Sequence, residues 1–332
     1  MTNPEDRQYQ FDFIKGTAII FVILNHAGIH EKYFYNYWNG QAVPLFITVS
    51  CVLACLSLFK NDSLKDYYSK EKVKKALIRI FKPFILAQIL LIIVYAALNK
   101  FSIHSFLASG GIGLGSYYPW LYLQLWVLMP LMFYLMKKSA LIGCIIIILV
   151  SIGTNVLFSI FSSSQWLEFS FVNNKKHIYL SIYRLCVNRY LFIFPLVYLL
   201  IEKKLRYNIL LFFSFISVVF IYCLRYKNVS LEPFIFDSGT WKVQEFPTHF
   251  YTILIFIILY KIYDYIPKVV QNIVNRIGKY SWEIFIVQMV YFAINSYFNI
   301  NNYLNLGLAL FICIIPVYTY KFMEKPIEIK RN

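Results

Sequence analysis

The chain has 332 residues, of which 59% are hydrophobic, 20% aromatic and only 14% charged. Because soluble globular domains carry about 25% charged residues, this composition excludes a soluble enzyme, a disordered tail and a secreted disulfide scaffold. The net charge of +16 is compatible with nucleic-acid binding, but basic residues in a membrane protein more often set its orientation, and no nucleic-acid partner is expected. We therefore predict an all-α, polytopic transmembrane bundle that forms one domain over residues 1–332, without a separate soluble domain.

A helix needs about 20 mostly apolar residues to cross a membrane, and ten segments come close to that requirement. In chain order they are residues 11–30, 42–59, 77–98, 118–136, 140–161, 186–202, 207–225, 249–265, 283–299 and 303–322. Residues 101–116 are short of that length and rich in glycine, so we expect a loop or a re-entrant segment there. Twenty basic residues on one set of flanks against eight on the other place both termini in the cytoplasm.

Four basic residues fall at or inside the ends of predicted helices: Lys15, Arg79, Lys82 and Arg189. A charge in the hydrocarbon region is costly, so it marks a functional site by default. The alternative is that the long side chain reaches back to the lipid headgroups. The six cysteines form no CxxC and no Cys/His cluster, so no metal site is expected.

The first predicted helix carries polar residues in an otherwise apolar sequence, FDFIKGTAIIFVILNH. Asp12 and Lys15 are three residues apart, so they can pair on one face. Eleven residues separate Lys15 from His26, which puts both on one stripe, about 16 Å apart along the axis. A single histidine in an apolar helix is usually a packing residue. Its alignment with the charged pair, and Asn25 beside it, favour instead a base that takes a proton from a hydroxyl.

This segment resembles the opening of the acyltransferase-3 family of integral-membrane acyltransferases. That family has a basic residue, ten intervening residues and a catalytic histidine on its first helix, usually after Leu-Asp. Asp12, Lys15 and His26 match this pattern, with Phe11 in the Leu position. The segment VPLFITVSC (43–51) resembles the next block of the family, in which Ser50 matches and a cysteine replaces the usual glycine.

Later segments resemble further blocks of the same family, so that the resemblance covers nearly the whole chain. They are KKALIRIFKPF (74–84), WLYLQLWVLMP (120–130), GKYSWEIFIVQ (278–288) and MEKP (323–326). In the third of these, Trp282 stands in place of a tyrosine and Gln288 in place of the usual histidine. The difference at Gln288 leaves the role of that position open. It does not affect the role expected for His26.

The resemblance implies that a cytoplasmic acyl-CoA, most commonly acetyl-CoA, donates its acyl group to an acceptor, often a carbohydrate, at or beyond the outer face. His26 is then the general base, with Asp12 and Lys15 as further catalytic residues. A relay through an acyl-imidazole is the alternative mechanism. Asn25 and Ser50 are the candidates for binding the reacting carbonyl oxygen.

The third predicted helix carries the candidate binding site for the coenzyme. Lys75, Arg79 and Lys82 recur at positions i, i+4 and i+7, which places them on one stripe of the helix. Phosphate groups require such cationic donors. The alternative is that these residues only set the orientation of the helix in the membrane.

Two long outer segments, residues 162–185 and 226–248, mix aromatic, amide and charged side chains, a composition that suits sugar binding. The candidate acceptor contacts are Trp166, Glu168, Asp237, Trp241 and Glu245. Each of them alone is equally compatible with a belt of interfacial residues. We expect the acceptor to be a carbohydrate or lipid-linked glycan, and the protein to lie in the cytoplasmic membrane of a bacterium.

Two other functions fit ten spans with basic residues in the membrane. The first is a non-catalytic transporter or flippase for a lipid-linked glycan, but the halves of the chain show no repeat of the kind that transporters commonly carry. The second is a glycan polymerase, which usually has larger outer loops. The concentration of polar residues in the first three helices favours an enzyme with its site in the first third of the chain.

Overall fold

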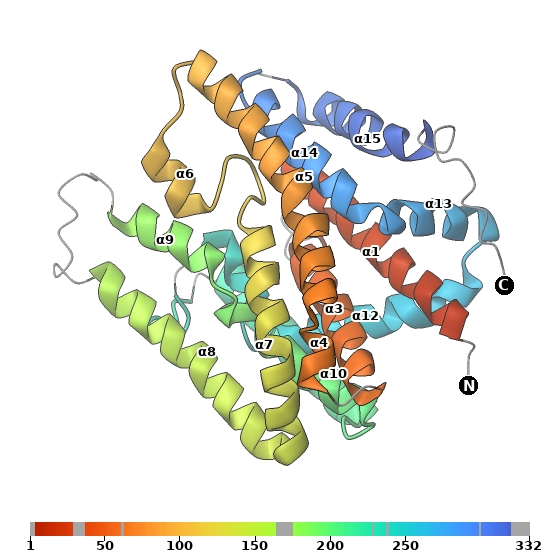
Figure 1. The fold of residues 1–332 in the computed structure, drawn as a ribbon. Coiled ribbons are helices and arrows are strands. Elements are labelled where there is room, and N and C mark those ends of the chain that lie inside the picture. Colours follow the sequence, from red (N-terminus) through yellow and green to blue (C-terminus); the bar gives the residue numbers. More distant parts are fainter. Residues whose placement is uncertain are drawn as a thin grey trace.

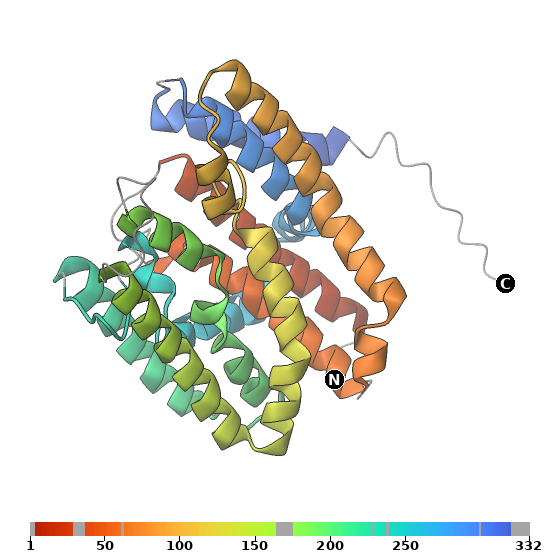
Figure 2. The same ribbon diagram turned by 60° about the vertical axis from the view of Figure 1, so that its left-hand side comes forward.

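A computed structural model describes residues 4–28, 37–60, 63–163, 175–227, 229–236, 239–298 and 300–319. Within these ranges all regular secondary structure is helical, as predicted (Figure 1). The first helix, α1 (Pro4–His26), and α3 (Ala42–Lys60) run through the middle of the bundle (Figures 1 and 2). Both bury continuous runs of Ile, Val and Phe against their neighbours, so the site that they carry lies inside the bundle.

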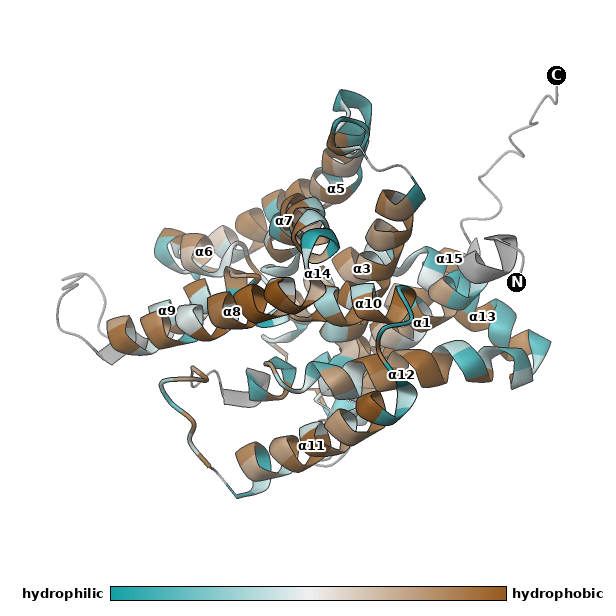
Figure 3. Ribbon diagram, turned by 90° about the horizontal axis from the view of Figure 1, so that it is seen from below, coloured by the Kyte–Doolittle hydropathy of each residue, from teal (hydrophilic) through white to brown (hydrophobic). Residues whose placement is uncertain are grey.

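Each of the ten predicted spans overlaps a helix in the described part of the chain. Besides α1 and α3 these are α5 (Lys70–Ala97), α7 (Tyr118–Lys138), α8 (Ala140–Ser163), α10 (Ile193–Ile201), α11 (Tyr207–Tyr226), α12 (His249–Ile262), α14 (Ser281–Asn295) and α15 (Asn302–Thr319). Five helices of the described chain are long and apolar enough to cross a membrane by themselves: α3, α5, α7, α8 and α11. Apolar residues cover most of α8, α11 and α12, whereas polar ones gather on α13 (Lys268–Lys279) and at the start of α5 (Figure 3).

The chain is therefore a multi-pass membrane protein with five such helices, or six if a bent pair counts as one span. The number of ten spans and the cytoplasmic termini remain predictions. Polar residues from Gln10 to His26 reduce the apolarity of α1, while α12 and α14 have only 14 and 15 residues.

The predicted helix at 186–202 does not begin at residue 186. Instead α9 (Lys175–Leu185) leads into a short 3-10 turn, Asn188–Tyr190, and then into α10, with a bend of 49° between the two parts. The side-chain amide of Gln124 bridges the break, since Nε2 donates to the carbonyl of Leu185 at 2.7 Å and Oε1 accepts from the amide of Val187 at 3.2 Å. These bonds replace part of the helical hydrogen bonding that is lost there.

The glycine-rich segment that follows the short helix α6 (Ile103–Ser109) is a loop, as expected. Gly110, Gly111, Gly113 and Gly115 all have positive φ, which residues with a Cβ rarely adopt. Gln88 of α5 holds the loop in the bundle, because its side chain exchanges two hydrogen bonds with the backbone of Ile112, at 2.6 and 3.0 Å. The loop thereby packs against α14, where Gly113 touches Met289.

The amphipathic helix α13 was not predicted, and it crosses α1 at a very short distance. A Cβ added to Gly278 would lie 1.7 Å from the carbonyl oxygen of Asp12, and one added to Gly16 would lie 2.2 Å from the carbonyl oxygen of Val274. Only glycine allows two helix backbones to approach so closely. This crossing fixes the N-terminal half of α1, where Asp12 and Lys15 stand.

Candidate functional site

A cavity of about 270 Å³ lies between α1, α3, α5, α7 and α14. It is lined by two cations, Lys15 and Arg79, by the hydroxyl of Ser50 and by the aromatic side chains of Phe46, Tyr118, Tyr122, Trp282 and Phe285, together with smaller apolar residues. In the described chain no acidic side chain lines it. The cavity thus combines positive charge with an apolar wall, which suits an anionic ligand that carries an apolar arm.

The predicted pair on α1 forms. Lys15 Nζ lies 2.6 Å from Asp12 Oδ1, and the two side chains are 25% and 26% exposed. Pairing lowers the cost of holding either charge in a partly buried position. Lys15 contributes to the cavity wall, while Asp12 stands about one turn closer to the N-terminus of α1, where it pairs with the lysine.

On α5, the three residues of the predicted cationic stripe separate. Arg79 lines the cavity, together with Ala76 and Ile80. Lys75 and Lys82 are exposed and do not belong to the lining. The cavity contacts only about one turn of α5, from Ala76 to Ile80, and Arg79 is the charged residue in that turn. The other two cations of the predicted stripe therefore lie outside the site.

The hydroxyl of Ser50 reaches the cavity from α3. It donates to the carbonyl of Phe46 at 2.9 Å within its own helix. Tyr122 of α7 stands next to both Ser50 and Arg79. A hydroxyl, a phenol and a guanidinium therefore come together on one wall, which is the part of the cavity with the most hydrogen-bond donors.

His26 stands one helical turn beyond the cavity, since Val22, four residues earlier on the same face, belongs to the lining. The ring is half-buried and turned into the bundle. Its Nδ1 lies 2.7 Å from Oε1 of Gln288 on α14, and the ring of Phe292 packs edge-on against it with centroids 5.6 Å apart. The imidazole therefore contacts α14, and it extends the line of polar groups that begins at Lys15.

The sequence model of the acyltransferase-3 family, described as an acyltransferase domain, matches residues 8–320. The chain belongs to this family. Searches of curated proteins and of solved structures return no match. As a member of the family with several apolar helices, the protein is a membrane acyltransferase.

The blocks that carry the family resemblance meet at the cavity. Lys15 comes from the first block, Ser50 from the second and Arg79 from the third, while GKYSWEIFIVQ supplies Ser281, Trp282 and Phe285 to the lining. The buried indole nitrogen of Trp282 has no hydrogen-bond partner among the described residues. Residues that are up to 270 positions apart in this acyltransferase therefore form one site.

The remaining predicted contacts do not join this site in the described part of the chain. Asn25 is half-buried and does not line the cavity. Trp166, Glu168 and Asp237 lie outside the described residues, as does the side chain of Trp241.

The prediction that Glu245 contacts an acceptor is wrong, because its side chain is fully buried and accepts a hydrogen bond from the hydroxyl of Tyr183 at 2.5 Å. Its charge interacts with that of Arg189. Arg189 is itself 0% exposed, which rules out the alternative that it reaches the lipid headgroups. The guanidinium lies over the rings of Tyr190 and Tyr183, at 4.9 and 5.6 Å from their centroids.

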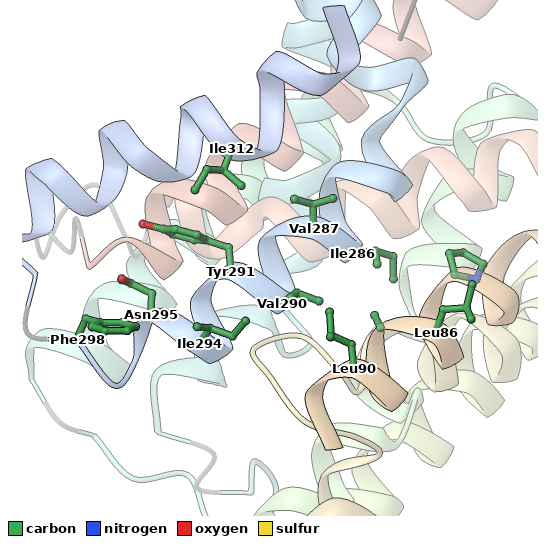
Figure 4. A pocket seen from close by; sticks show the side chains of 12 residues that line it. Leu86, Leu90, Ile286, Val287, Val290, Tyr291, Ile294, Asn295, Phe298 and Ile312 are labelled. Carbon is green, nitrogen blue, oxygen red and sulfur yellow. The ribbon is translucent and has the colours of Figure 1, made fainter. Parts of the chain in front are cut away.

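A second and larger cavity, of about 680 Å³, opens between α5, α14 and α15. Figure 4 shows its wall of aliphatic side chains, among them Leu86, Leu90 and Val290, with Tyr291 and Asn295 at one end. On α14, Val290 is 160° around the axis from Gln288, but Tyr291 and Asn295 are only 60° and 20° away from it at 100° per residue. The groove therefore extends around this helix from the far side toward the face that carries Gln288. Among the described residues no charged side chain lines it, so the smaller cavity is the one that offers cations to an anionic ligand.

Proposed function

We propose that this protein transfers an acetyl group from cytoplasmic acetyl-CoA to a hydroxyl of a surface or nascent polysaccharide, with His26 as the general base. The observation that carries the proposal is the single polar line from Lys15 and Arg79, at the cavity, to His26 one turn beyond it. Cations at one end suit the phosphates of the donor. A half-buried imidazole at the other end suits proton transfer from the acceptor.

The size of the cavity indicates which part of the donor could enter it and which part would stay outside. About 270 Å³ is at or below the lower end of ordinary ligand pockets, and it cannot enclose a whole coenzyme A. Arg79 is exposed as well as cavity-lining. The nucleotide would therefore remain at the cytoplasmic entrance beside Arg79, while the pantetheine arm passes between the aromatic side chains and carries the thioester toward His26, about 16 Å from Lys15.

The transfer itself needs one base and one acid. Nε2 of His26 takes the proton of the acceptor hydroxyl as its oxygen bonds to the thioester carbonyl carbon. The carbon–sulfur bond then breaks, and the imidazolium returns the proton to the sulfur of coenzyme A, so that the histidine ends neutral. General-base assistance of this kind contributes about 10²–10⁴ in rate, and the remainder must come from placing the two substrates.

The carbonyl oxygen that becomes negative needs donors close to it. Ser50 is favoured over Asn25, because its hydroxyl lines the cavity whereas Asn25 does not. In this arrangement Asp12 has no contact with the substrate and acts through Lys15. The enzyme would work in the cytoplasmic membrane of a bacterium with both termini inside, which brings the donor to α5 and the acceptor to the far end of α1.

The test uses His26→Ala in lipid nanodiscs with acetyl-CoA and surface polysaccharide whose O-acetyl groups have been removed with alkali. Release of free coenzyme A is measured together with acetyl incorporation into the polysaccharide. We expect the wild-type protein to release coenzyme A only with the acceptor present, and His26→Ala to release none. His104→Ala, which changes an exposed histidine on α6, is the matched control and should keep full activity.

Acetylation by His26→Ala at the wild-type rate would remove this residue from the mechanism. No release of coenzyme A by the wild-type protein with any polysaccharide would contradict the proposed reaction and favour the transport of a lipid-linked glycan. In cells, the acetyl content of the surface polysaccharide with and without the gene gives the same answer for the natural acceptor.

A further inference from the structure

Gln288 is buried in the middle of α14, with 0% of its side chain exposed. It stands three residues after Phe285, which lines the cavity, and so points to the same face of the helix one turn further along. His26 has the same relation to Val22 on α1. The two helices therefore leave the cavity together, and their next polar side chains meet in the contact of 2.7 Å between Nδ1 of His26 and Oε1 of Gln288.

The chemistry of this contact decides which nitrogen of the ring carries the proton. An amide oxygen only accepts hydrogen bonds, so Nδ1 must be the donor. In a neutral imidazole the lone pair then belongs to Nε2, the nitrogen on the far side of the ring. Phe292 packs edge-on against the ring and limits its rotation, so the tautomer and the direction of the lone pair are both fixed.

Stability does not explain a glutamine at this position. Its Nε2 group is buried and has no hydrogen-bond partner among the described residues. A buried donor without a partner destabilises the folded protein, and a methionine of similar size would avoid that cost. The bond to His26 is the hydrogen bond that this amide makes within the described part of the chain, and it points to a role in the reaction.

We propose that Gln288 is a positioning residue that holds His26 with its Nδ1 proton toward α14 and its Nε2 lone pair toward the acceptor hydroxyl. This inference rests on the proposed function, in which His26 is the base. Because an amide is uncharged, Gln288 orients the ring without the strong stabilisation of the imidazolium that a carboxylate gives. The family's usual histidine would give the same position a titrating group, so this enzyme has exchanged a titrating partner for a neutral one.

The first test removes the amide. Gln288→Met should lower kcat by about 10- to 100-fold, since the ring loses the bond that fixes its tautomer, while KM for acetyl-CoA stays unchanged. Thermal stability should stay the same or rise. The matched control is Gln271→Met in α13, which also removes a buried glutamine with hydrogen bonds to Tyr263 and Ile266. It should lose stability and keep kcat.

The second test changes the amide to a carboxylate. Gln288→Glu keeps the shape and can still accept from Nδ1, so the variant should stay active. Its negative charge should stabilise the imidazolium and move the acidic limb of the kcat/KM profile to higher pH by about one unit or more. If the amide donated to Nδ1 instead, Gln288→Glu would lose its bond and most of its activity.

Other titratable groups lie on α1 and on the elements packed against it, and they are the same in the wild-type protein and in Gln288→Glu. Among the described side chains they are Tyr9, Asp12 and Lys15 on α1 itself, Cys51, Cys55 and Lys60 on α3, His249, Tyr251, Tyr260 and Lys261 on α12, Lys268, Arg276 and Lys279 on α13, Glu283 and Tyr291 on α14, and Tyr303, Cys313 and Tyr318 on α15. The difference between the two pH profiles therefore reports the change at position 288.

The outcomes separate this inference from the proposed function. If His26→Ala is inactive but Gln288→Met has the kcat and pH profile of the wild-type protein, the positioning role is overturned and the general base stands. A Gln288→Glu variant that is folded but inactive also overturns it. If His26→Ala is fully active, the proposed function fails first, and changes at Gln288 have no bearing on a base at His26.

Discussion

The crossing of α1 and α13 predicts a large effect from one added methyl group, in Gly278→Ala. The new Cβ would lie 1.7 Å from the carbonyl oxygen of Asp12 and 2.8 Å from the amide nitrogen of Gly16. Cβ contacts in proteins essentially never fall below 3.0 Å. The helices must therefore separate by about 1.3 Å at this point, and because both contacts are with backbone, no change of rotamer can relieve them.

The cost follows from this displacement. Overpacking of this kind destabilises proteins by about 1–3 kcal/mol. Lys15 then shifts with α1 relative to the cavity wall formed by α3 and α5, and a misplacement of about 1 Å can reduce a rate about 10²-fold. We expect Gly278→Ala to lower both the unfolding temperature and the rate of acetyl transfer, with the larger effect on the rate.

Thermal unfolding in detergent measures the first quantity, and release of coenzyme A in nanodiscs measures the second. Gly153→Ala in α8 and Gly307→Ala in α15 are matched controls, since a Cβ at either position meets no atom within 4 Å. Alanine favours a helix over glycine by about 0.8–1.0 kcal/mol, so these variants should be as stable as the wild type or more so. If Gly278→Ala behaves like the controls in both assays, the close crossing does not position the site.

The remaining predictions test the cavity wall and the buried carboxylate. Arg79→Ala should raise the apparent KM for acetyl-CoA by about 10- to 100-fold, which is the value of a hydrogen bond to a charged group. Lys75→Ala, which lies outside the lining, should leave this KM unchanged. Equal effects of the two substitutions would mean that both residues only set the orientation of the helix in the membrane. Ser50→Ala should lower kcat by about 10-fold or more if its hydroxyl binds the oxyanion, and Asn25→Ala should leave kcat unchanged. A loss of kcat in Asn25→Ala but not in Ser50→Ala, measured in a steady-state assay, would make Asn25 the residue that binds the oxyanion. Burial raises the pKa of Glu245, in the loop before α12, from 4.5 to about 7, although Arg189 and the hydroxyl of Tyr183 oppose the shift. The folded protein then holds this proton more tightly than the unfolded chain between these two values, so stability should fall as the pH rises through that window and level off above it. The unfolding temperature of the wild-type protein should therefore decrease between pH 4.5 and about pH 7, and that of Glu245→Gln should not. An equal decrease in the variant would mean that other groups cause the pH dependence.

Most helices could be predicted from the sequence because their formation depends on local apolar length. The bounds of α3, α7, α8 and α11 follow the predicted spans closely. The break between α9 and α10 could not be predicted in this way, since it depends on Gln124, more than 60 residues away, to satisfy the broken backbone. The helix α13 was missed because it is amphipathic and too polar to resemble a span, and only the glycines at its crossing with α1 explain its position.

The same distinction holds for the site. The spacing of Asp12, Lys15 and His26 is a property of one helix, so the ion pair and the common stripe could be inferred from it. The partner of His26 comes from a residue 262 positions later, and nothing local to His26 indicates it. Gln288 could have been found as a polar residue in an apolar segment that matches a family block. On α5, a regular cationic spacing suggested three binding residues, but the width of the cavity admits only Arg79.

The enclosure of Arg189 has a consequence for how this protein is made. Its guanidinium is sealed among tyrosine rings, and its countercharge is Glu245, which the ribosome adds 56 residues later. An isolated arginine at membrane depth is unfavourable until that countercharge arrives. This countercharge is therefore missing until α11 and the loop before α12 have been synthesised. We expect α9 and α10 to reach their final buried positions only after that part of the chain has been added.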